Sequence, residues 1–135
     1  MKQIRCPCGS GQNYDACCQP FHKGALPDSA LKLMRSRYTA YALNLPSYII
    51  KTTHLDNPHY CEDLALWAQE ISAFALQTQF EKLEIVDFEE NGEVATVTFV
   101  AHLSQNGQDC TFTEKSDFEK VKERWLYRSG EVTRG

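Results

Sequence analysis

The stretch CPCGSGQNYDACC, residues 6–18, decides how the chain begins to fold. It holds four of the six cysteines as two close pairs, Cys6 with Cys8 and Cys17 with Cys18. A structural zinc ion takes four such ligands in a tetrahedron, at Zn–S distances of about 2.3 Å, and keeps no coordination position open. Two short-range pairs also limit the chain entropy that is lost when the ligands gather. The stretch therefore predicts a closed, structural zinc site with these four cysteines as ligands.

Two disulfides are the alternative for the same cysteines. Neighbouring residues such as Cys17 and Cys18 bond to each other only with strain, and disulfides persist in oxidising compartments. The segment Met1–Arg5 has charges but no apolar run, so it predicts no signal peptide. We therefore expect a cytoplasmic chain whose paired cysteines are reduced and bind zinc.

These residues also resemble the SEC-C motif, a small zinc-binding module that ends the preprotein translocase motor SecA. The resemblance lies in Cys-Pro-Cys-Gly-Ser-Gly at residues 6–11, then Tyr14, then the pair Cys17-Cys18. It implies the same four zinc ligands. In SecA the module binds the chaperone SecB, so the resemblance implies a surface for a protein partner rather than a catalytic site.

Composition excludes several classes of protein. The 135 residues are 42% hydrophobic and 24% charged, as in soluble globular chains. The net charge of −4 gives no electrostatic footprint for nucleic acid or an anionic membrane, and no apolar run approaches the roughly 20 residues that span a bilayer. The length predicts a module with its linker over residues 1–27 and one ordinary domain over 28–135. Phe21 and Leu26, in the linker, are expected to pack the module against that domain.

Hydrophobic periodicity predicts helices first and strands afterwards. Apolar residues recur every three or four positions over 30–44 and 62–78, which predicts two amphipathic helices. In the first, Lys32, Arg35 and Ser36 lie away from the apolar stripe, so they are expected on the outer face. Pro46 is expected to end this helix, and a shorter helix is expected from Ser47 to Lys51. From Phe80 the period changes to two. Strands are predicted over 83–88, 94–103, 111–119 and 125–127, with hairpin turns at the Asn-Gly pairs 91–92 and 106–107. The buried face of the second strand is expected to carry Ala95, Val97, Phe99, Ala101 and Leu103.

This order of elements predicts an α+β fold, with helices packed on one face of a curved four-stranded antiparallel sheet. It resembles the cone of the nuclear transport factor 2 (NTF2)-like, or cystatin-like, domains. Together with the SEC-C start, the segments 33–38, 48–54 and 124–127 resemble the YchJ (UPF0225) family over nearly the whole chain. Such cones often hold a pocket between helices and sheet, and in some relatives the pocket is an active site. Tyr38, Tyr41 and Tyr127 could line it, although tyrosines at helical spacing, such as Tyr38 and Tyr41, are more often core residues with a polar tip.

Two arginines of the first long helix are candidates for such a pocket. Arg35 and Arg37 could bind a small anionic ligand, because a guanidinium pairs bidentately with carboxylate or phosphate. They could instead pair with Glu114 or Asp117 and fix the helix on the sheet. Ion pairing is the commoner fate of a buried arginine, which favours the structural role.

The loop after residue 53 carries the remaining candidates. His54 could act as a general base if a carboxylate oriented its ring, and the sequence identifies no such partner. His54, His59 and Cys61 could form a second metal cluster, but no fourth ligand is close in sequence, so no second site is predicted. Cys61 and Cys110 are expected to be buried, unreactive thiols.

Two functions follow from these patterns. The leading interpretation is a non-enzymatic zinc-containing adaptor, whose module binds a protein partner and whose cone supplies a scaffold or a ligand pocket. The alternative is a small enzyme of hydrolase or isomerase type, acting on an anionic small molecule with His54 and either Arg35 or Arg37. The outer face of the sheet is only mildly polar and could support a dimer.

Overall fold

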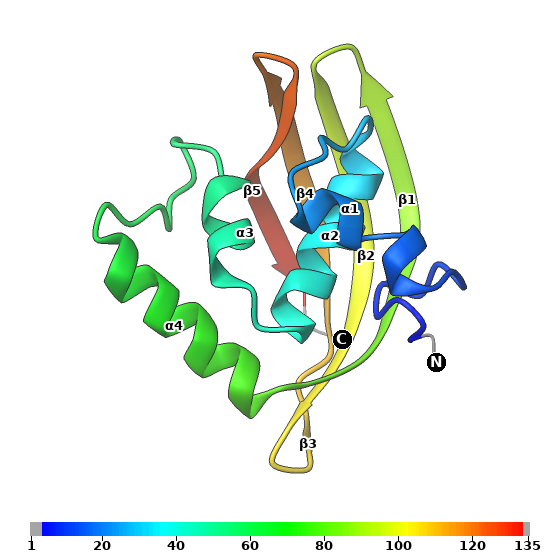
Figure 1. Cartoon of the computed structure of the whole chain (residues 1–135), viewed down its shortest axis with the longest axis vertical. Helices are drawn as coiled ribbons and strands as arrows, with labels where there is room; N and C mark the ends of the chain where they lie inside the picture. The colour runs from blue at the N-terminus through cyan, green and yellow to red at the C-terminus, as the bar shows by residue number, and fades with distance from the viewer. Residues whose placement is uncertain (1–3, 134–135) are drawn as a thin grey trace.

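A curved antiparallel sheet covered on one face by helices makes up most of the chain in the computed structural model, which describes residues 4–133 (Figure 1). Residues 1–3, part of the segment considered as a signal peptide, and residues 134–135, the end of the expected domain, lie outside the described residues. The helical elements are η1 (Tyr14–Ala16), α1 (Gln19–His22), α2 (Ala30–Ala42), α3 (Pro46–Lys51) and α4 (Leu64–Gln77). The strands are β1 (Gln79–Asn91), β2 (Val94–Gln105), β3 (Gln108–Asp109), β4 (Phe112–Val121) and β5 (Arg124–Thr133).

The sheet confirms the predicted meander. Its strand order is β1-β2-β4-β5, all neighbours are antiparallel, and the two-residue β3 pairs with the end of β2. Register shifts in β1, between Phe80 and Lys82 and between Ile85 and Asp87, mark bulges that increase the local twist and bend the strand. The five residues expected on the inner face of β2 are all buried: Ala95, Val97, Phe99, Ala101 and Leu103.

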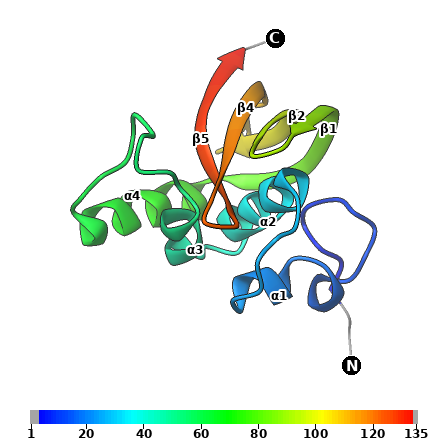
Figure 2. The ribbon, with the colours of Figure 1, turned by 90° about the horizontal axis from the view of Figure 1, so that it is seen from above.

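Helix α2 is the central element of the helical layer. Its first turn is capped by Ser29, whose hydroxyl accepts the backbone N–H of Lys32 at 3.2 Å. Figure 2 shows α2 lying between the sheet and the amino-terminal module. This position explains a difference from the sequence pattern, which placed Ser36 on the outer face of the helix. Ser36 is 0% exposed, because the module and α3 cover the side of α2 that faces away from the sheet.

Helix α4 confirms the second long helix. Asp63 caps it by accepting the backbone N–H of Leu66 at 3.1 Å, and the buried face carries Trp67, Ile71 and Ala75. Between residues 4 and 133, no helix combines the length and apolar character needed to cross a bilayer.

His22 fastens the module to the domain. Its Nε2 lies 2.9 Å from the Ser36 carbonyl oxygen, which can only accept, so Nε2 carries the proton. Nδ1 therefore accepts the Tyr14 hydroxyl at 2.7 Å, and the ring packs edge-on against Tyr48. Burial lowers the pKa of His22, because it disfavours the charged imidazolium. Leu26, expected to help this packing, is instead 56% exposed.

Replacing His22 by leucine is expected to reduce the free energy of unfolding by about 1–2 kcal/mol, because two buried hydrogen bonds are lost. The neutral ring is favoured in the folded state, so the wild-type contribution is complete above the unfolded-state pKa of about 6.5 and declines as pH falls below it. Urea unfolding on either side of that pH, at constant metal content, should show a smaller pH dependence for His22→Leu. The exposed His59, changed to leucine, is the control; equal pH dependence in both variants would contradict the assignment.

Candidate metal centre and binding pocket

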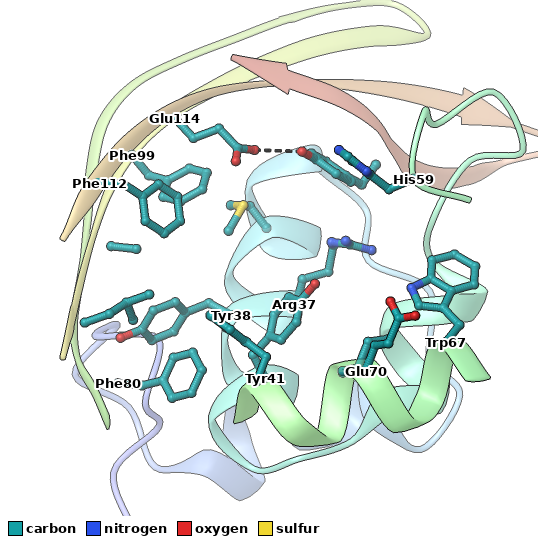
Figure 3. Close-up of a pocket in the computed structure, with 16 residues that line it drawn as sticks. Arg37, Tyr38, Tyr41, His59, Trp67, Glu70, Phe80, Phe99, Phe112 and Glu114 are labelled. Carbon is teal, nitrogen blue, oxygen red and sulfur yellow. Dashed lines mark hydrogen bonds between the residues drawn. The ribbon is translucent and has the colours of Figure 1, made fainter. Parts of the chain in front are cut away.

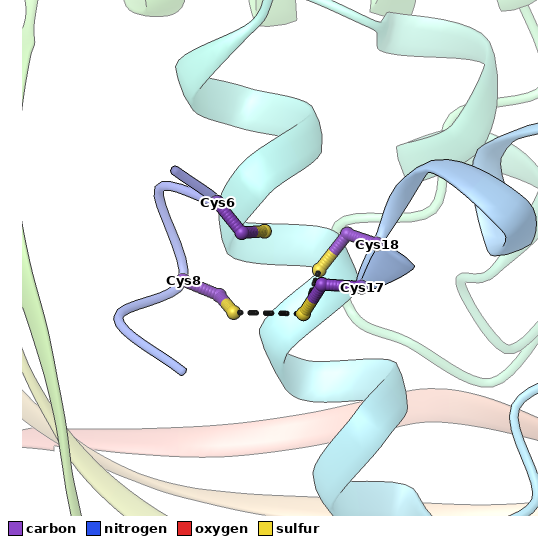
Figure 4. Close-up of side chains that lie close together, drawn as sticks. All are labelled: Cys6, Cys8, Cys17 and Cys18. Atoms are coloured by element: carbon purple, nitrogen blue, oxygen red, sulfur yellow. Dashed lines mark hydrogen bonds between the residues drawn. The ribbon is translucent and has the colours of Figure 1, made fainter. Parts of the chain in front are cut away.

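The four amino-terminal cysteines come together in one cluster (Figure 4). Their sulfur atoms all lie within 4.8 Å of one another. The Sγ atoms of Cys8 and Cys17 are 3.6 Å apart, and those of Cys17 and Cys18 are 3.9 Å apart. A tetrahedron with metal–sulfur bonds of about 2.3 Å has edges of about 3.8 Å. All four thiols are free of disulfides, so the cluster could hold a metal ion.

Backbone geometry around the first pair shapes this cluster. The N–H of Cys6 donates to the Gln12 carbonyl at 2.9 Å, which closes the loop on itself. Gly9 has φ = 80°, in the left-handed region that favours glycine. A Cβ at position 9 would also lie only 3.3 Å from the Leu83 carbonyl oxygen of β1. A residue without a side chain is therefore needed where the loop approaches the sheet.

The cluster is enclosed by the module and α2. Cys6, Cys8 and Cys18 are buried, and Arg35 of α2 donates from Nη1 to the Cys8 carbonyl at 2.8 Å. Hydrogen bonds from Cys18 and Cys6 lower the pKa of the Cys8 thiol, whereas burial raises the pKa of Cys17 to about 11. A bound cation would let all four sulfurs be thiolates, as metal ligation requires. With four protein sulfurs as ligands, such a centre would be structural.

A second feature is a cavity of about 610 Å³ between α2, α4 and the sheet (Figure 3). This volume falls in the range of small-molecule pockets, roughly 300–1,000 Å³. Its walls are mainly aromatic, with Tyr41, Phe74, Phe80, Phe99 and Phe112 among them. Tyr38 and Tyr127 line it as well, so all three tyrosines of the sequence prediction face this space.

Arg37 is the buried cation of the pocket, with 5% of its surface exposed. Its Nη1 donates to the Ile49 carbonyl at 3.1 Å and to the hydroxyls of Thr52 and Thr53 at 2.8 and 3.1 Å. Its Cζ lies 4.6 Å from the centroid of the Tyr127 ring. Burial lowers the pKa of Arg37. Among residues 4–133, no carboxylate oxygen lies within 4.0 Å of the guanidinium, and no hydrogen bond leaves its other nitrogens.

Neither arginine pairs with the carboxylates that the sequence suggested. Arg37 lies instead against the carboxyl end of α3, where helix carbonyls favour a cation. Glu114 accepts hydrogen bonds at Oε2 from the hydroxyls of Tyr127, at 2.9 Å, and Ser116. Asp117 accepts a hydrogen bond from Ser129 at 3.2 Å. One sequence feature could have indicated the partners of Arg37. Thr52 and Thr53 follow the apolar helical segment of α3, and their hydroxyl oxygens are acceptors at the end of that helix.

His54 finds a carboxylate partner, but outside the pocket. Its Nδ1 accepts the backbone N–H of Asp56 at 2.9 Å, so Nε2 carries the proton and donates to Glu119 at 2.6 Å. Glu119 also lies 3.4 Å from Arg128. His54, Arg35 and Arg37 therefore occupy three different places: the flank of β5, the cysteine cluster and the pocket.

The other candidates of the loop, His59 and Cys61, do not come together with His54 either. His59 is exposed at the rim of the pocket, while Cys61 is half-buried with its Sγ 3.4 Å from the Asp63 carbonyl. Cys110 is half-buried too, so neither thiol is buried as expected. Within the part of the chain that the structure describes, the four cysteines form the one group of three or more side chains placed to hold a metal. The second metal cluster does not form.

The structure combines a cysteine cluster with a curved sheet that helices cover on one face. This combination is that of proteins with a SEC-C motif beside an NTF2-like domain. Residues 5–20 match the SEC-C motif. Residues 29–130 match the family described as YchJ, middle NTF2-like domain. The chain belongs to the YchJ family, which confirms the resemblance seen in the sequence.

Relatives agree with this assignment. A UPF0225 protein of Bordetella pertussis is 36% identical over 132 residues, covering 94% of this chain and 92% of its own. The solution structure of a SEC-C motif containing protein from Rhodopseudomonas palustris has a TM-score of 0.82 at 34% identity, covering 96% of this chain and 99% of its own. A domain of Nostoc punctiforme with a cystatin-like fold has a TM-score of 0.60 at 15% identity, covering 76% of this chain and 73% of its own, and shows the fold alone.

Proposed function

We propose that this chain is a zinc-stabilised, non-catalytic binding protein, whose cone pocket takes a small ligand with an aromatic body and an anionic group. The observation that carries the proposal is Arg37, a cation that lines the pocket, is 5% exposed and has no carboxylate within 4.0 Å among the described residues. An unpaired buried charge is costly. A ligand carboxylate would compensate it and make a charge-assisted, bidentate hydrogen bond.

Zinc is the metal that the cysteine cluster suits. Four thiolates are soft ligands, and tetrahedral all-sulfur sites favour zinc over the hard cations magnesium and calcium. The sulfur separations of 3.6 and 3.9 Å are close to the edges of a tetrahedral zinc–thiolate centre. Arg35 of α2 donates to the Cys8 carbonyl, and the Cys6 sulfur lies 3.5 Å from the hydroxyl of Thr39 on the same helix, so the metal would hold the module on the domain.

The aromatic walls indicate the body of the ligand. Tyr41 and Phe74 meet edge to face, as do Phe74 and Phe80, so an apolar surface runs from α4 to the sheet. Rings of a ligand would pack on this surface with the geometry that aromatic pairs prefer. The enzyme alternative needs His54 to meet Arg35 or Arg37 at the pocket, whereas His54 and Arg35 lie outside it. The geometry therefore favours binding over the enzyme alternative.

Titration of the metal-loaded chain with L-phenylalanine and 3-phenylpropionate, which share a phenyl ring and a carboxylate, tests the pocket. We expect at least one to bind at submillimolar concentration and to change the fluorescence of Trp67, which lines the cavity. Arg37→Lys keeps the charge but loses the planar fork, and should weaken binding at least about tenfold, or 1.4 kcal/mol. Arg128→Lys, at an exposed site, is the control. Absence of binding for both compounds at millimolar concentration would overturn the proposal.

A second candidate function, the adaptor, is favoured by a groove of about 240 Å³ between the linker, α3 and the start of β5. Apolar Phe21 and the exposed Leu26 line it, beside the exposed cations Lys51 and Arg124. Arg124 is held in place because its Nη2 donates to the Lys51 carbonyl at 3.1 Å. In a chain of net charge −4, this basic and apolar groove suits an acidic, apolar segment of a protein partner.

Charge reversal tests the adaptor. Affinity capture with the wild-type chain should retain a partner that Lys51→Glu/Arg124→Glu loses, and the retained fraction should fall with added salt. Lys115→Glu, on an exposed position of β4, is the matched control and should retain the partner. An identical partner set for the wild type and the groove variant would count against this role.

A further inference from the structure

Glu114 is a second charge in the pocket that the proposed function does not use. It lies on β4, lines the cavity, and faces the same space as Arg37 (Figure 3). Its Oε2 is occupied by two donors, the hydroxyls of Tyr127 and Ser116. Among the described residues, nothing donates a hydrogen bond to Oε1. One carboxylate oxygen is thus fixed by the sheet and the other is available to a ligand.

Tyr127 connects the two charges. Its ring face contacts the Arg37 guanidinium, and its hydroxyl donates to Glu114. Burial and the nearby Glu114 carboxylate raise the pKa of Tyr127, which keeps this hydroxyl a donor. The cation and the anion are therefore separated by one tyrosine ring without forming an ion pair. The pocket therefore offers a donor at one side and an acceptor at the other, and the further carboxylate on its lining, Glu70, is exposed.

We propose that the ligand carries a cationic donor next to its anionic group, as an aromatic α-amino acid does. This inference rests on the proposed pocket function and narrows the ligand class. The ligand carboxylate would bind Arg37, its ammonium would donate to Glu114 Oε1, and its ring would lie on the aromatic walls. Arg37 and Glu114 contact the same tyrosine side chain, so the two groups of the ligand need to be close together, as they are on the single Cα of an α-amino acid.

Ligands with only one charge fit less well. A simple carboxylate would satisfy Arg37 but place a second negative charge near Glu114, whose remaining oxygen would be desolvated without a donor. A simple amine would satisfy Glu114 but leave Arg37 uncompensated beside another cation. A zwitterion adds no net charge to the pocket and gives Arg37 and Glu114 each a partner of opposite charge.

Gly130 supplies an independent probe of this arrangement. A Cβ at position 130 would lie 2.7 Å from the Tyr127 hydroxyl and 2.7 Å from Cδ of Glu114. Real Cβ contacts are not that short, so both groups would have to move. Gly130→Ala therefore displaces the acceptor and its tyrosine without changing any charge of the pocket.

Calorimetric titration of the metal-loaded chain with three matched compounds tests the inference: L-phenylalanine, 3-phenylpropionate and phenethylamine. We expect L-phenylalanine to bind at least about tenfold more tightly than either of the others, equivalent to 1.4 kcal/mol. Glu114→Gln and Gly130→Ala should each reduce the preference over 3-phenylpropionate to within about twofold, or 0.4 kcal/mol. Asp117→Asn, an exposed neighbour on the same strand, should keep it.

The outcomes separate the two proposals. If 3-phenylpropionate binds the wild type as tightly as L-phenylalanine, the zwitterion inference is overturned while the pocket function stands. If phenethylamine binds as tightly as L-phenylalanine, both are overturned, because phenethylamine has no anionic group. If neither L-phenylalanine nor 3-phenylpropionate binds, the pocket function fails and takes the inference with it. If Glu114→Gln unfolds, Gly130→Ala decides, because its pocket charges are intact; an unchanged preference in a folded Gly130→Ala chain overturns the role of Glu114.

Discussion

Removing the metal from the cysteine cluster is expected to lower the midpoint of thermal unfolding by roughly 15 °C. A ligand present at about a thousand times its dissociation constant stabilises the folded state by about 4 kcal/mol, and each kcal/mol moves the midpoint of a domain of this size by a few degrees. Hydrogen bonds with Cys6 and Cys8, together with burial, raise the pKa of the Cys18 thiol, so a bound cation is needed for the whole set to be thiolates. Without it, the module is expected to unfold from α2.

Metal analysis and circular dichroism check this prediction. We expect one zinc per chain in protein purified without chelator, and Cys8→Ser should lose both the zinc and the thermal stability. Cys110→Ser removes a thiol outside the cluster and should keep both. A chelated chain that melts at the wild-type temperature, or Cys8→Ser protein with full zinc content, would show that the cluster is not a structural metal centre.

The gathering of the cysteines could be predicted because its determinants are local. The two cysteine pairs lie within residues 6–18, with glycines between them. Few conformations of so short a segment keep the four sulfur atoms far apart. The meander was predictable for the same reason: each strand pairs with its neighbour in sequence, and Gly92 and Gly107 supply the positive φ of two of its turns.

Long-range partners could not be read from the chain. His54 meets Glu119 across 65 positions, the difference between 119 and 54, and no local pattern links them. Ser36 was placed on the outer face of its helix because a helical period cannot reveal that a second layer, the module, covers that face. Gly130 was also missed, since an extended glycine gives no turn signal and its importance lies in the space that Glu114 and Tyr127 occupy.

Arg37→Ala is expected to reduce the free energy of unfolding by about 3 kcal/mol. Charge-assisted hydrogen bonds contribute about 1.5–3 kcal/mol each, and their effects overlap because all three leave one nitrogen. The acceptors belong to the carboxyl end of α3 and to Thr52 and Thr53, so the variant also releases this end of α3 from α2. Loss of the contact with the Tyr127 ring adds to the effect.

Urea unfolding at constant zinc content measures the change, and Arg128→Ala is the matched control. Arg128 is also paired with oxygen atoms, those of Asp56 and Glu119, but its side chain is 46% exposed, so its loss should cost under about 1 kcal/mol. Arg37→Lys should fall between the two, because an ammonium keeps the charge but cannot stack on Tyr127 as a planar guanidinium does. Arg37→Ala no less stable than Arg128→Ala would contradict this prediction. The desolvation cost of the buried guanidinium would then offset its hydrogen bonds, and the presence of Arg37 in the pocket would have to be explained by ligand binding alone.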